Sequence, residues 1–377
     1  MLRAHKFRIY PNKSQQKQMA KTFGCVRFVW NKNVEAFRNK GEFKTSTEYR
    51  QEFEFLKEVS AAAVQQKELD FKEYKSQKFS KTRKIKIGKP KFKSRKKKQS
   101  FRLPNQKFKI IGNKIQLEKI GRVPIVIDKM FDGRTISVTI SKDLCGDYFA
   151  SILVEEVILP LPKTGKSVGV DVGLKALITT SDGLQVQRLR DNQAKLKRCQ
   201  KMMSRKKKGS RRWNDLRLRV ARLHRDIARR RSWLLHNVSR HLVENYDVIC
   251  VEDLNVVGMM KNHKLAAAIA DASWSELIRQ LDYKCKWYGK ELVKIDRWSP
   301  SSKTCNACGK KKAALNLAER TFVCGHCNYK NDRDVNAALN IKAVGVTAAL
   351  QTVMGCKTYF SGKPLKQALS GDLLSFL

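Results

Sequence analysis

The chain has 377 residues, 42% of them hydrophobic, and its 79 lysines and arginines against 34 acidic residues give a formal net charge of +45 at pH 7. This apolar content excludes a disordered chain and predicts two or three globular domains, while the uncompensated charge predicts a nucleic-acid partner, because self-repulsion is costly without a polyanion. An anionic membrane is the alternative partner, but no apolar run has transmembrane length and no basic amphipathic anchor is present, so no membrane association is expected.

The N-terminal residues predict one strand followed by helices. Residues 6–10 alternate in polarity as a strand does, and Pro11 and Asn12 end the pattern. The basic, alternating start does not resemble a signal peptide. From Ser14 onward apolar residues recur at every third or fourth position, which predicts a helix, and a further helical pattern spans residues 47–75.

A strongly basic segment follows these helices. Thirteen of the twenty-four residues from Lys75 to Lys98 are lysine or arginine, and none is acidic. A solvated, flexible charge run is one interpretation. Phe79, Pro90 and Phe92 favour another, an arm that lies on phosphates while its aromatic rings pack or stack.

Residues 101–156 have a β pattern. Gly112 and Asn113 separate two short apolar runs and predict a tight hairpin, and residues 135–140 and 148–154 predict a second strand pair. Several short antiparallel strands, joined by the N-terminal one, predict a small barrel or sandwich. The Leu-Pro-Leu-Pro run at residues 159–162 predicts a domain boundary.

Two apolar strands after this boundary carry a carboxylate. Asp171 interrupts the first, where a lone charge costs several kcal/mol unless it is paired or bound to a metal. Gly169 and Gly173 leave room for a ligand backbone to approach it. Glu252 ends the second strand, at the edge where parallel-sheet sites gather, although it or the adjacent Asp253 could instead be a salt-bridged strand end.

A third carboxylate opens a helix that is predicted from the apolar spacing after residue 334. Asp332 is placed to cap that helix or to face its dipole, whereas Asp334 lies in the first turn and can point toward the sheet. The three acids together have a ribonuclease H-like layout. Three carboxylates converging on two divalent ions can clamp a phosphodiester, and Mg²⁺ or Mn²⁺ suits such oxygen ligands better than zinc.

Four cysteines form two C-x-x-C pairs separated by fifteen residues, which predicts a structural zinc site with the ligands Cys305, Cys308, Cys324 and Cys327. His326, between two of these ligands, is expected to support the site without binding the metal. The other six cysteines are expected to be reduced thiols: Cys25, Cys145, Cys199, Cys250, Cys285 and Cys356.

A long basic helical region separates the first two acids. Seventeen of the thirty-seven residues from Lys195 to Arg231 are lysine or arginine, and an apolar stripe runs from Leu216 to Leu242. We expect the stripe to face the core. The opposite face is then a phosphate track or, alternatively, a merely solvated surface.

Taken in order, these motifs resemble the TnpB family of insertion-sequence-encoded RNA-guided nucleases, which is related to the type V CRISPR effectors. The resemblance covers about residues 1–343. It rests on residues 7–11, 24–31, 169–175, 251–254, 300–302 with the four cysteines, and 332–341.

The resemblance implies a bilobed, multidomain protein of mixed α/β and β class. A wedge-type β-barrel with an inserted helical domain forms one lobe, and a ribonuclease H-like (RuvC) nuclease domain with a zinc-ribbon insertion forms the other. The implied order is the first wedge strand at 1–12, a helical recognition domain with the basic arm at 13–100, the wedge barrel at 101–162, the nuclease at 163–299, the ribbon at 300–330, the nuclease again at 331–343 and a tail at 344–377. We expect the tail to be loosely ordered.

The resemblance also implies an RNA-guided DNA endonuclease that binds a guide RNA and target double-stranded DNA and cuts beside a short motif read by protein. By motif position Asp171, Glu252 and Asp334 are the implied catalytic residues and Mg²⁺ ligands, in a prokaryotic cytoplasmic protein that works at the nucleoid. A nuclease-silent RNA-guided regulator would lack acids of the site. A transposase without a guide RNA would leave the helical segment, the basic arm and the barrel without a role.

Overall fold

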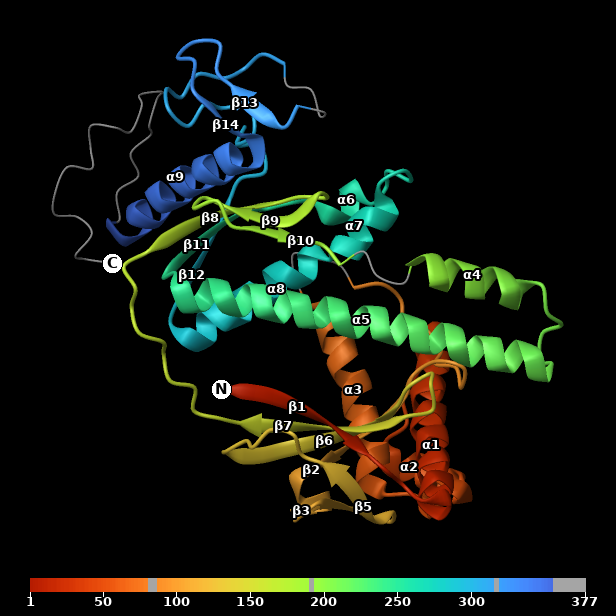
Figure 1. The fold of residues 1–377 in the computed structure, drawn as a ribbon. Coiled ribbons are helices and arrows are strands. Elements are labelled where there is room, and N and C mark those ends of the chain that lie inside the picture. The colour runs from red at the N-terminus through yellow and green to blue at the C-terminus, as the bar shows by residue number, and fades with distance from the viewer. Residues whose placement is uncertain (81–86, 190–192, 315–318, 355–377) are drawn as a thin grey trace. The chain divides into compact units, whose positions relative to one another are not determined.

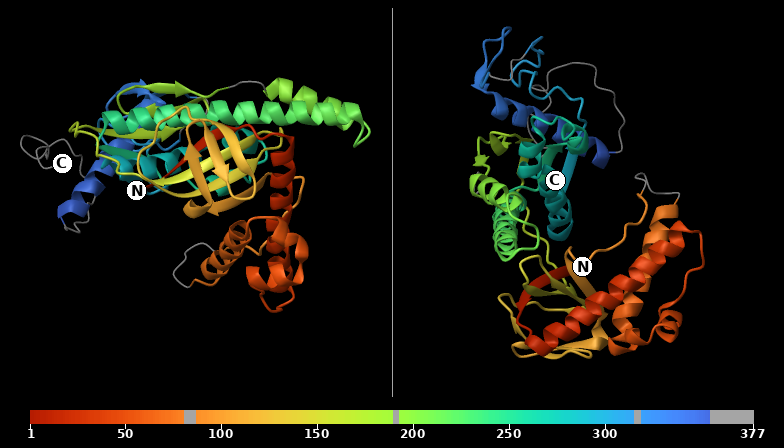
Figure 2. Two further views of the ribbon diagram at one scale, coloured as in Figure 1. Left: turned by 90° about the horizontal axis from the view of Figure 1, so that it is seen from below. Right: turned by 90° about the vertical axis from the view of Figure 1, so that its right-hand side faces the viewer.

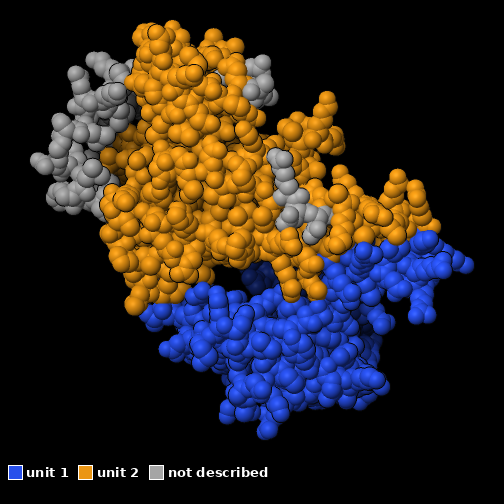
Figure 3. All heavy atoms as spheres, in the orientation of Figure 1, with its two compact units in different colours: residues 1–157, 206–222 blue, residues 158–205, 223–377 orange. Residues whose placement is uncertain are grey.

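The computed structural model describes residues 1–80, 87–189, 193–314 and 319–354. The chain forms two compact units, residues 1–157 with 206–222 and residues 158–205 with 223–377 (Figure 3). Among the described residues, no helix combines the length and the apolar character that crossing a lipid bilayer requires. Each unit has its own sheet and its own core.

The first unit is built on a curved seven-stranded antiparallel sheet with the order β2-β6-β7-β1-β5-β4-β3 (Figures 1 and 2). Its inward-facing side chains, from Phe7 on β1 to Val154 on β7, form one core, as in a nearly closed barrel. This confirms the barrel, including its N-terminal strand. The strands are β1 (Leu2–Ile9), β2 (Gln99–Pro104), β3 (Phe108–Ile111), β4 (Lys114–Leu117), β5 (Gly121–Val126), β6 (Arg134–Lys142) and β7 (Tyr148–Glu155).

Both predicted strand pairs are present in this sheet. In the β3–β4 hairpin Gly112 has a φ of +54°, a left-handed conformation that glycine adopts without steric cost. The second pair, β6 and β7, is antiparallel along its length.

The helices of this unit pack on the barrel and on one another. Helix α1 (Lys13–Arg38) begins at Asn12, whose side chain and that of Gln15 cap each other's backbone. The helical pattern at residues 47–75 is three elements: α2 (Ser46–Glu52), η1 (Glu54–Glu58) and α3 (Ala61–Phe79). The break follows from Phe53, which is extended, and from Ser60, which caps α3.

The described part of the basic arm is tied to α1. Trp30 Nε1 donates to the carbonyl of Lys91 over 3.0 Å, and Asn31 both donates to the Lys93 carbonyl and accepts from its N–H, at 3.1 and 2.8 Å. The Phe92 ring lies 4.5 Å from the Arg38 guanidinium. Between residues 87 and 98 the arm is therefore packed against α1 and is not a flexible, solvated segment. Its contact with phosphates stays a prediction.

The second unit contains a five-stranded sheet with the order β10-β9-β8-β11-β12. Strands β8, β11 and β12 are parallel, whereas β9 and β10 continue the sheet antiparallel beyond β8. This is the ribonuclease H-like arrangement that the acids predicted. The strands are β8 (Ser167–Val172), β9 (Ala176–Thr180), β10 (Gln185–Gln187), β11 (Val248–Glu252) and β12 (Glu291–Ile295).

Helices cover both faces of this sheet. One core packs the sheet against α5, α7 and α8, and α9 lies on the opposite face (Figure 1). A small two-stranded sheet, β13 (Thr321–Val323) and β14 (Lys330–Asp332), precedes α9 and belongs to the ribbon predicted at residues 300–330. The helices are α4 (Gln193–Ser204), α5 (Arg211–Asn245), α6 (Val256–Met259), α7 (Ala266–Ala272), α8 (Trp274–Tyr288) and α9 (Arg333–Met354).

The expectation of a loosely ordered tail after residue 343 is wrong for its first eleven residues, because α9 continues to Met354. The helix is held by packing: a Cβ added to Gly345 would lie 2.4 Å from the Sγ of Cys250 on β11, so the two elements are in close contact. Residues 355–377, which include Cys356, lie outside the described residues. The nine described cysteines form no disulfide.

Candidate active site and metal centre

Two parallel strands set Asp171 and Glu252 beside each other. Val170 of β8 pairs with Val251 of β11, so the next residue on each strand is the carboxylate, at the carboxyl end of the sheet. Side chains alternate across a strand, and Val170 and Val251 point into the core formed with α5 and α8. Both carboxylates therefore project toward the other face, where α9 lies.

Helix α9 brings the third acid to this face. A Cβ on Gly169 of β8 would lie 2.0 Å from the carbonyl oxygen of Ala338 and 2.5 Å from the N–H nitrogen of Lys342, so only glycine lets α9 cross the strand here. The prediction that Gly169 makes room for a ligand is thus wrong: it makes room for α9. Asp334 lies four residues before Ala338, in the first turn of that helix.

The structure separates the roles of the two neighbouring aspartates. Oδ1 of Asp332 accepts hydrogen bonds from the backbone N–H groups of Asp334 and Val335 at 2.9 and 3.1 Å. Asp332 is therefore the helix cap, as its position predicted. The carboxylate of Asp334 takes no part in this cap, and the guanidinium of Arg333 lies 3.2 Å from its Oδ1.

The pKa of Asp171 is affected by both of the other acids. Burial, and then the negative charges of Glu252 and Asp334, raise the pKa of Asp171 to about 8, against the opposing effect of Arg333. Burial also raises the pKa of Glu252 above its ordinary value, although a hydrogen bond from Ser301 opposes this. Glu252 and Asp334 thus destabilise the charged form of Asp171, and a bound cation would relieve that cost.

The carboxylates suit a hard divalent cation, because all their donor atoms are oxygens. Asp171 interacts with each of the other two acids, but the structure does not gather the three round a single ion position. Within the described parts of the chain, only the four cysteines bring three or more ligand atoms that close together.

Ser301, to which sequence reasoning gave no role, is part of the site. Its hydroxyl donates to Oε1 of Glu252. The Pro-Ser-Ser run at residues 300–302 was noticed as a motif, but nothing in the sequence connects it to an acid forty-nine residues earlier. Arg333 was likewise missed, although a cation between two aspartates in residues 332–334 was a visible signal.

The four predicted zinc ligands lie together in the ribbon. Their Sγ atoms all lie within 4.8 Å of one another, with 3.7 Å between Cys305 and Cys327 and 3.6 Å between Cys308 and Cys324. A tetrahedron of thiolates about 2.3 Å from zinc has edges of about 3.8 Å, so the cluster fits this ion. The backbone N–H groups of Cys327 and His326 lower the pKa of Cys324 to about 6, which favours the thiolate that zinc binds.

Two asparagines that the sequence analysis missed fasten this ribbon to α9. Asn340 Nδ2 donates to the carbonyls of Ser301 and Thr304, both at 2.7 Å, and Asn336 Nδ2 donates to that of Thr304 at 2.8 Å. Both asparagines are buried. The two asparagines are four residues apart, so they lie on one face of the helix, and asparagine has a low intrinsic helix propensity. This pattern was the signal in the sequence that both have a structural role.

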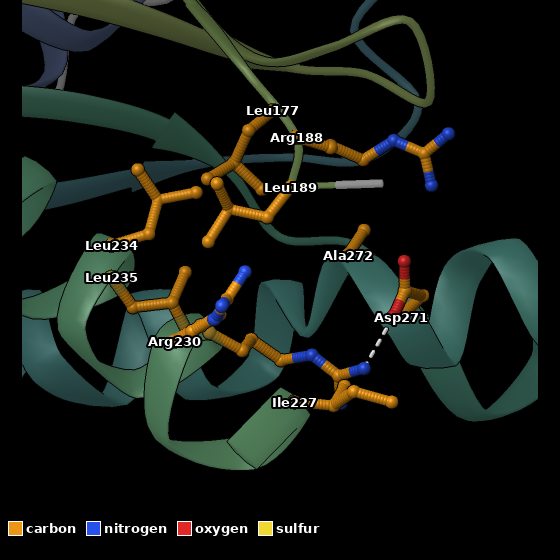
Figure 4. Close-up of a pocket in the computed structure, with 10 residues that line it drawn as sticks. Leu177, Arg188, Leu189, Ile227, Arg230, Leu234, Leu235, Asp271 and Ala272 are labelled. Atoms are coloured by element: carbon orange, nitrogen blue, oxygen red, sulfur yellow. Dashed lines mark hydrogen bonds and ion pairs between the residues drawn. The ribbon is translucent and has the colours of Figure 1, made fainter. Parts of the chain in front are cut away.

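A small hollow elsewhere in this unit is not part of the site (Figure 4). It lies between α5, α7 and the chain after β10, and Arg231 pairs with Asp271 at its edge. Its volume of about 20 Å³ suffices for roughly one water molecule. None of the three carboxylates lines it, so we regard it as a packing feature.

Comparison with known proteins places this geometry in a family. A model described as "Probable transposase" matches residues 151–263, one described as "Cas12f1-like, TNB domain" matches 274–341, and one described as "Helix-turn-helix domain" matches 1–38. A Streptomyces pristinaespiralis protein named "Putative RNA-guided DNA endonuclease" is 38% identical, over 92% of this chain and 90% of the relative. The chain belongs to the TnpB family.

Further likenesses agree with this assignment. A second relative of this TnpB-family chain, "Putative RNA-guided DNA endonuclease InsQ" of Escherichia coli (strain K12), is 31% identical and is covered over 97% of either chain. The protein in a solved Cas12f1–sgRNA–target DNA complex superposes with a TM-score of 0.50 at 13% identity, over 91% of this chain and 98% of that one. At this identity the match supports the fold alone, and it agrees with the predicted mixed, multidomain class.

Proposed function

We propose that Asp171, Glu252 and Asp334 form the active site with which this RNA-guided DNA endonuclease of an insertion sequence hydrolyses a phosphodiester of its target DNA. The observation that carries the proposal is the position of Asp171: it lies on the central strand, and its carboxylate interacts with both other acids. A buried carboxylate whose pKa is raised by neighbouring acids is characteristic of sites that are completed by a cation.

Two Mg²⁺ or Mn²⁺ ions are the cations that these oxygens would hold, with Asp171, Glu252 and Asp334 as the protein ligands. Such an ion supplies positive charge to the phosphodiester oxygens and lowers the pKa of a bound water. The three acids would be the ligands, and no histidine is among the groups that shift the pKa of Asp171.

The neighbouring side chains orient these acids. Ser301 donates to Oε1 of Glu252 and would thereby orient that carboxylate for binding the cation. Arg333 lies beside Asp334, where its guanidinium would also bind a phosphate oxygen of the substrate.

We propose further that Cys305, Cys308, Cys324 and Cys327 bind a structural zinc ion. The ion would hold the two knuckles of the ribbon together, and Asn336 and Asn340 connect the ribbon to α9. Zinc would thereby support catalysis indirectly, by keeping Ser301 against Glu252.

The partners proposed are a guide RNA and target double-stranded DNA. The net charge of +45 requires polyanions, and the solvent-facing side of α5 presents Arg217, Arg219 and Arg229. Base pairing with the guide would read the target sequence, while protein would hold the backbones and read a short adjacent motif.

The test is Asp171→Asn, which preserves the side-chain volume and removes the charge. Cleavage of a guide-matched DNA should fall by at least about a thousandfold, while guide-RNA and target binding stay at wild-type levels. Asp282→Asn is the matched control, because Asp282 is a partly exposed carboxylate of α8 that pairs with Lys286 at 2.8 Å. Equal cleavage by the Asp171 variant and the wild type would remove the proposed site, and loss of binding would make Asp171 a structural residue.

A further inference from the structure

A pocket of about 200 Å³ opens beside Glu252 on the side of the sheet away from α9. It is ten times as large as the hollow beside Arg231. Val251 and Ile278 line its apolar wall, and Glu252 and Lys294 stand at its edge. We propose that this pocket binds one nucleobase of the DNA strand being cut, next to the bond that is hydrolysed.

The chemistry of the pocket suits a flat ring with polar edges. Val251, Ile278 and the ring of Trp274 provide apolar surface against which a base can pack. Trp274 is only 3% exposed, and its indole Nε1 has no hydrogen-bond acceptor among the described residues. A buried N–H without an acceptor is unfavourable. We take this N–H to face the pocket, where the carbonyl oxygen or ring nitrogen of a base would satisfy it.

The charges of the pocket agree with a nucleotide as the ligand. Lys294 on β12 provides a cation for a neighbouring phosphate. The lining acid Asp253 is paired with Arg297, which reduces its repulsion of a polyanion. Trp274 and Ser275 form the first turn of α8, a fifteen-residue helix, whose N-terminal dipole also favours negative charge.

The register of the sheet connects this pocket to the acids. Val251 points into the core that contains Trp274 and Ile278, whereas Glu252, the next residue, points toward α9. The pocket and the carboxylates thus meet at the end of β11. A nucleotide whose phosphate is bound at the cation site of Asp171 and Glu252 would place its base in the pocket, on the other side of the end of β11.

The inference rests on the proposed function, and the experiment separates the two. Guide-matched DNA substrates carry a single abasic site, placed in turn at each position flanking the cut, and single-turnover cleavage is compared with the intact substrate. We expect an abasic site at one position to slow the wild-type protein about tenfold. The ratio between intact and abasic substrates cancels any general loss of stability in a variant.

Two adjacent valines give a matched pair of variants. Val256 lines the pocket, whereas Val257 is 79% exposed and does not. Val256→Trp should fill the pocket and bring the intact-to-abasic ratio close to one, and Val257→Trp should keep the wild-type ratio. Trp274→Phe, which keeps an aromatic ring and removes the N–H, should lower the ratio as well.

The outcomes are distinct. If the wild-type protein does not cut any guide-matched DNA, the proposed function fails and the pocket proposal fails with it. If the protein cuts but no abasic position changes the rate, or if Val256→Trp keeps the wild-type ratio, the pocket proposal alone is overturned.

Discussion

Replacing Gly169 by alanine tests whether the packing of α9 on β8 sets the active site. The added Cβ would lie 2.0 Å from the carbonyl oxygen of Ala338, whereas ordinary contacts begin at 3.4 Å, so the helix must withdraw by about 1.4 Å. The obstacle is backbone, which no side-chain rotation can relieve. Overpacking of this kind costs about 1–3 kcal/mol of stability.

The same displacement moves Asp334, four residues before Ala338, away from Asp171. A misplacement of about 1 Å in an active site can cost roughly a hundredfold in rate, so we expect at least that loss in single-turnover cleavage by Gly169→Ala. The melting temperature should fall as well. Guide-RNA binding should not change.

Gly24→Ala is the control for this experiment. Gly24 lies inside α1, where the nearest atom to an added Cβ is 3.9 Å away, so alanine should stabilise that helix by roughly 0.5–1 kcal/mol. Wild-type cleavage and melting temperature in Gly169→Ala would refute the close packing. A lower melting temperature with full cleavage per folded molecule would show that α9 does not set the geometry of the acids.

Three further predictions concern the supports of the site. Asn340→Ala removes two hydrogen bonds to ribbon carbonyls, and it should lower the free energy of unfolding by about 1–3 kcal/mol and slow cleavage while the zinc content, measured by elemental analysis, stays unchanged. Cys324→Ser should lower both the zinc content and the melting temperature, and an unchanged metal analysis would contradict the ribbon assignment. Lys290→Met removes the charged partner of the buried Asp247, leaving it only the N–H groups of Thr164 and Gly165, and should cost about 3–5 kcal/mol. Burial opposes ionisation of Asp247, but the ion pair with Lys290 lowers its pKa below the ordinary value. The stability that this ion pair contributes is therefore complete above the unfolded pKa of about 3.9 and is lost as the pH falls through the lower folded pKa. Urea titrations should show a smaller difference in unfolding free energy between variant and wild type at pH 3 than at pH 7.

The candidate site could be predicted from the sequence where a local pattern conflicts with its surroundings. Asp171 stands out because a charge does not belong in an apolar strand, and the four cysteines stand out by their spacing. The parallel pairing of the two strands that carry Asp171 and Glu252 follows from the same logic, because apolar strands that end in acids are typical of a parallel sheet. Each of these signals can be recognised within a short stretch of the chain.

The remaining contacts could not be predicted, because each joins residues that are far apart in sequence. Ser301 looks like a loop serine until the fold sets it against Glu252. Asn340 looks like a weak helix former until its amide is seen to hold the ribbon. The prediction of one helical pattern over residues 47–75 missed the breaks for a different reason. The apolar spacing continues through Phe53, but the backbone of Phe53 is extended.

These unpredicted contacts converge on one element. Helix α9 carries Asp334 in its first turn, crosses β8 at Gly169 and holds the ribbon through Asn340. The ribbon in turn places Ser301 against Glu252. A displacement of α9 therefore affects two of the three acids at once, one directly and one through the ribbon. If this is correct, Gly169→Ala combined with Asn340→Ala should lose less cleavage activity than the product of the two single losses, because both variants release the same helix.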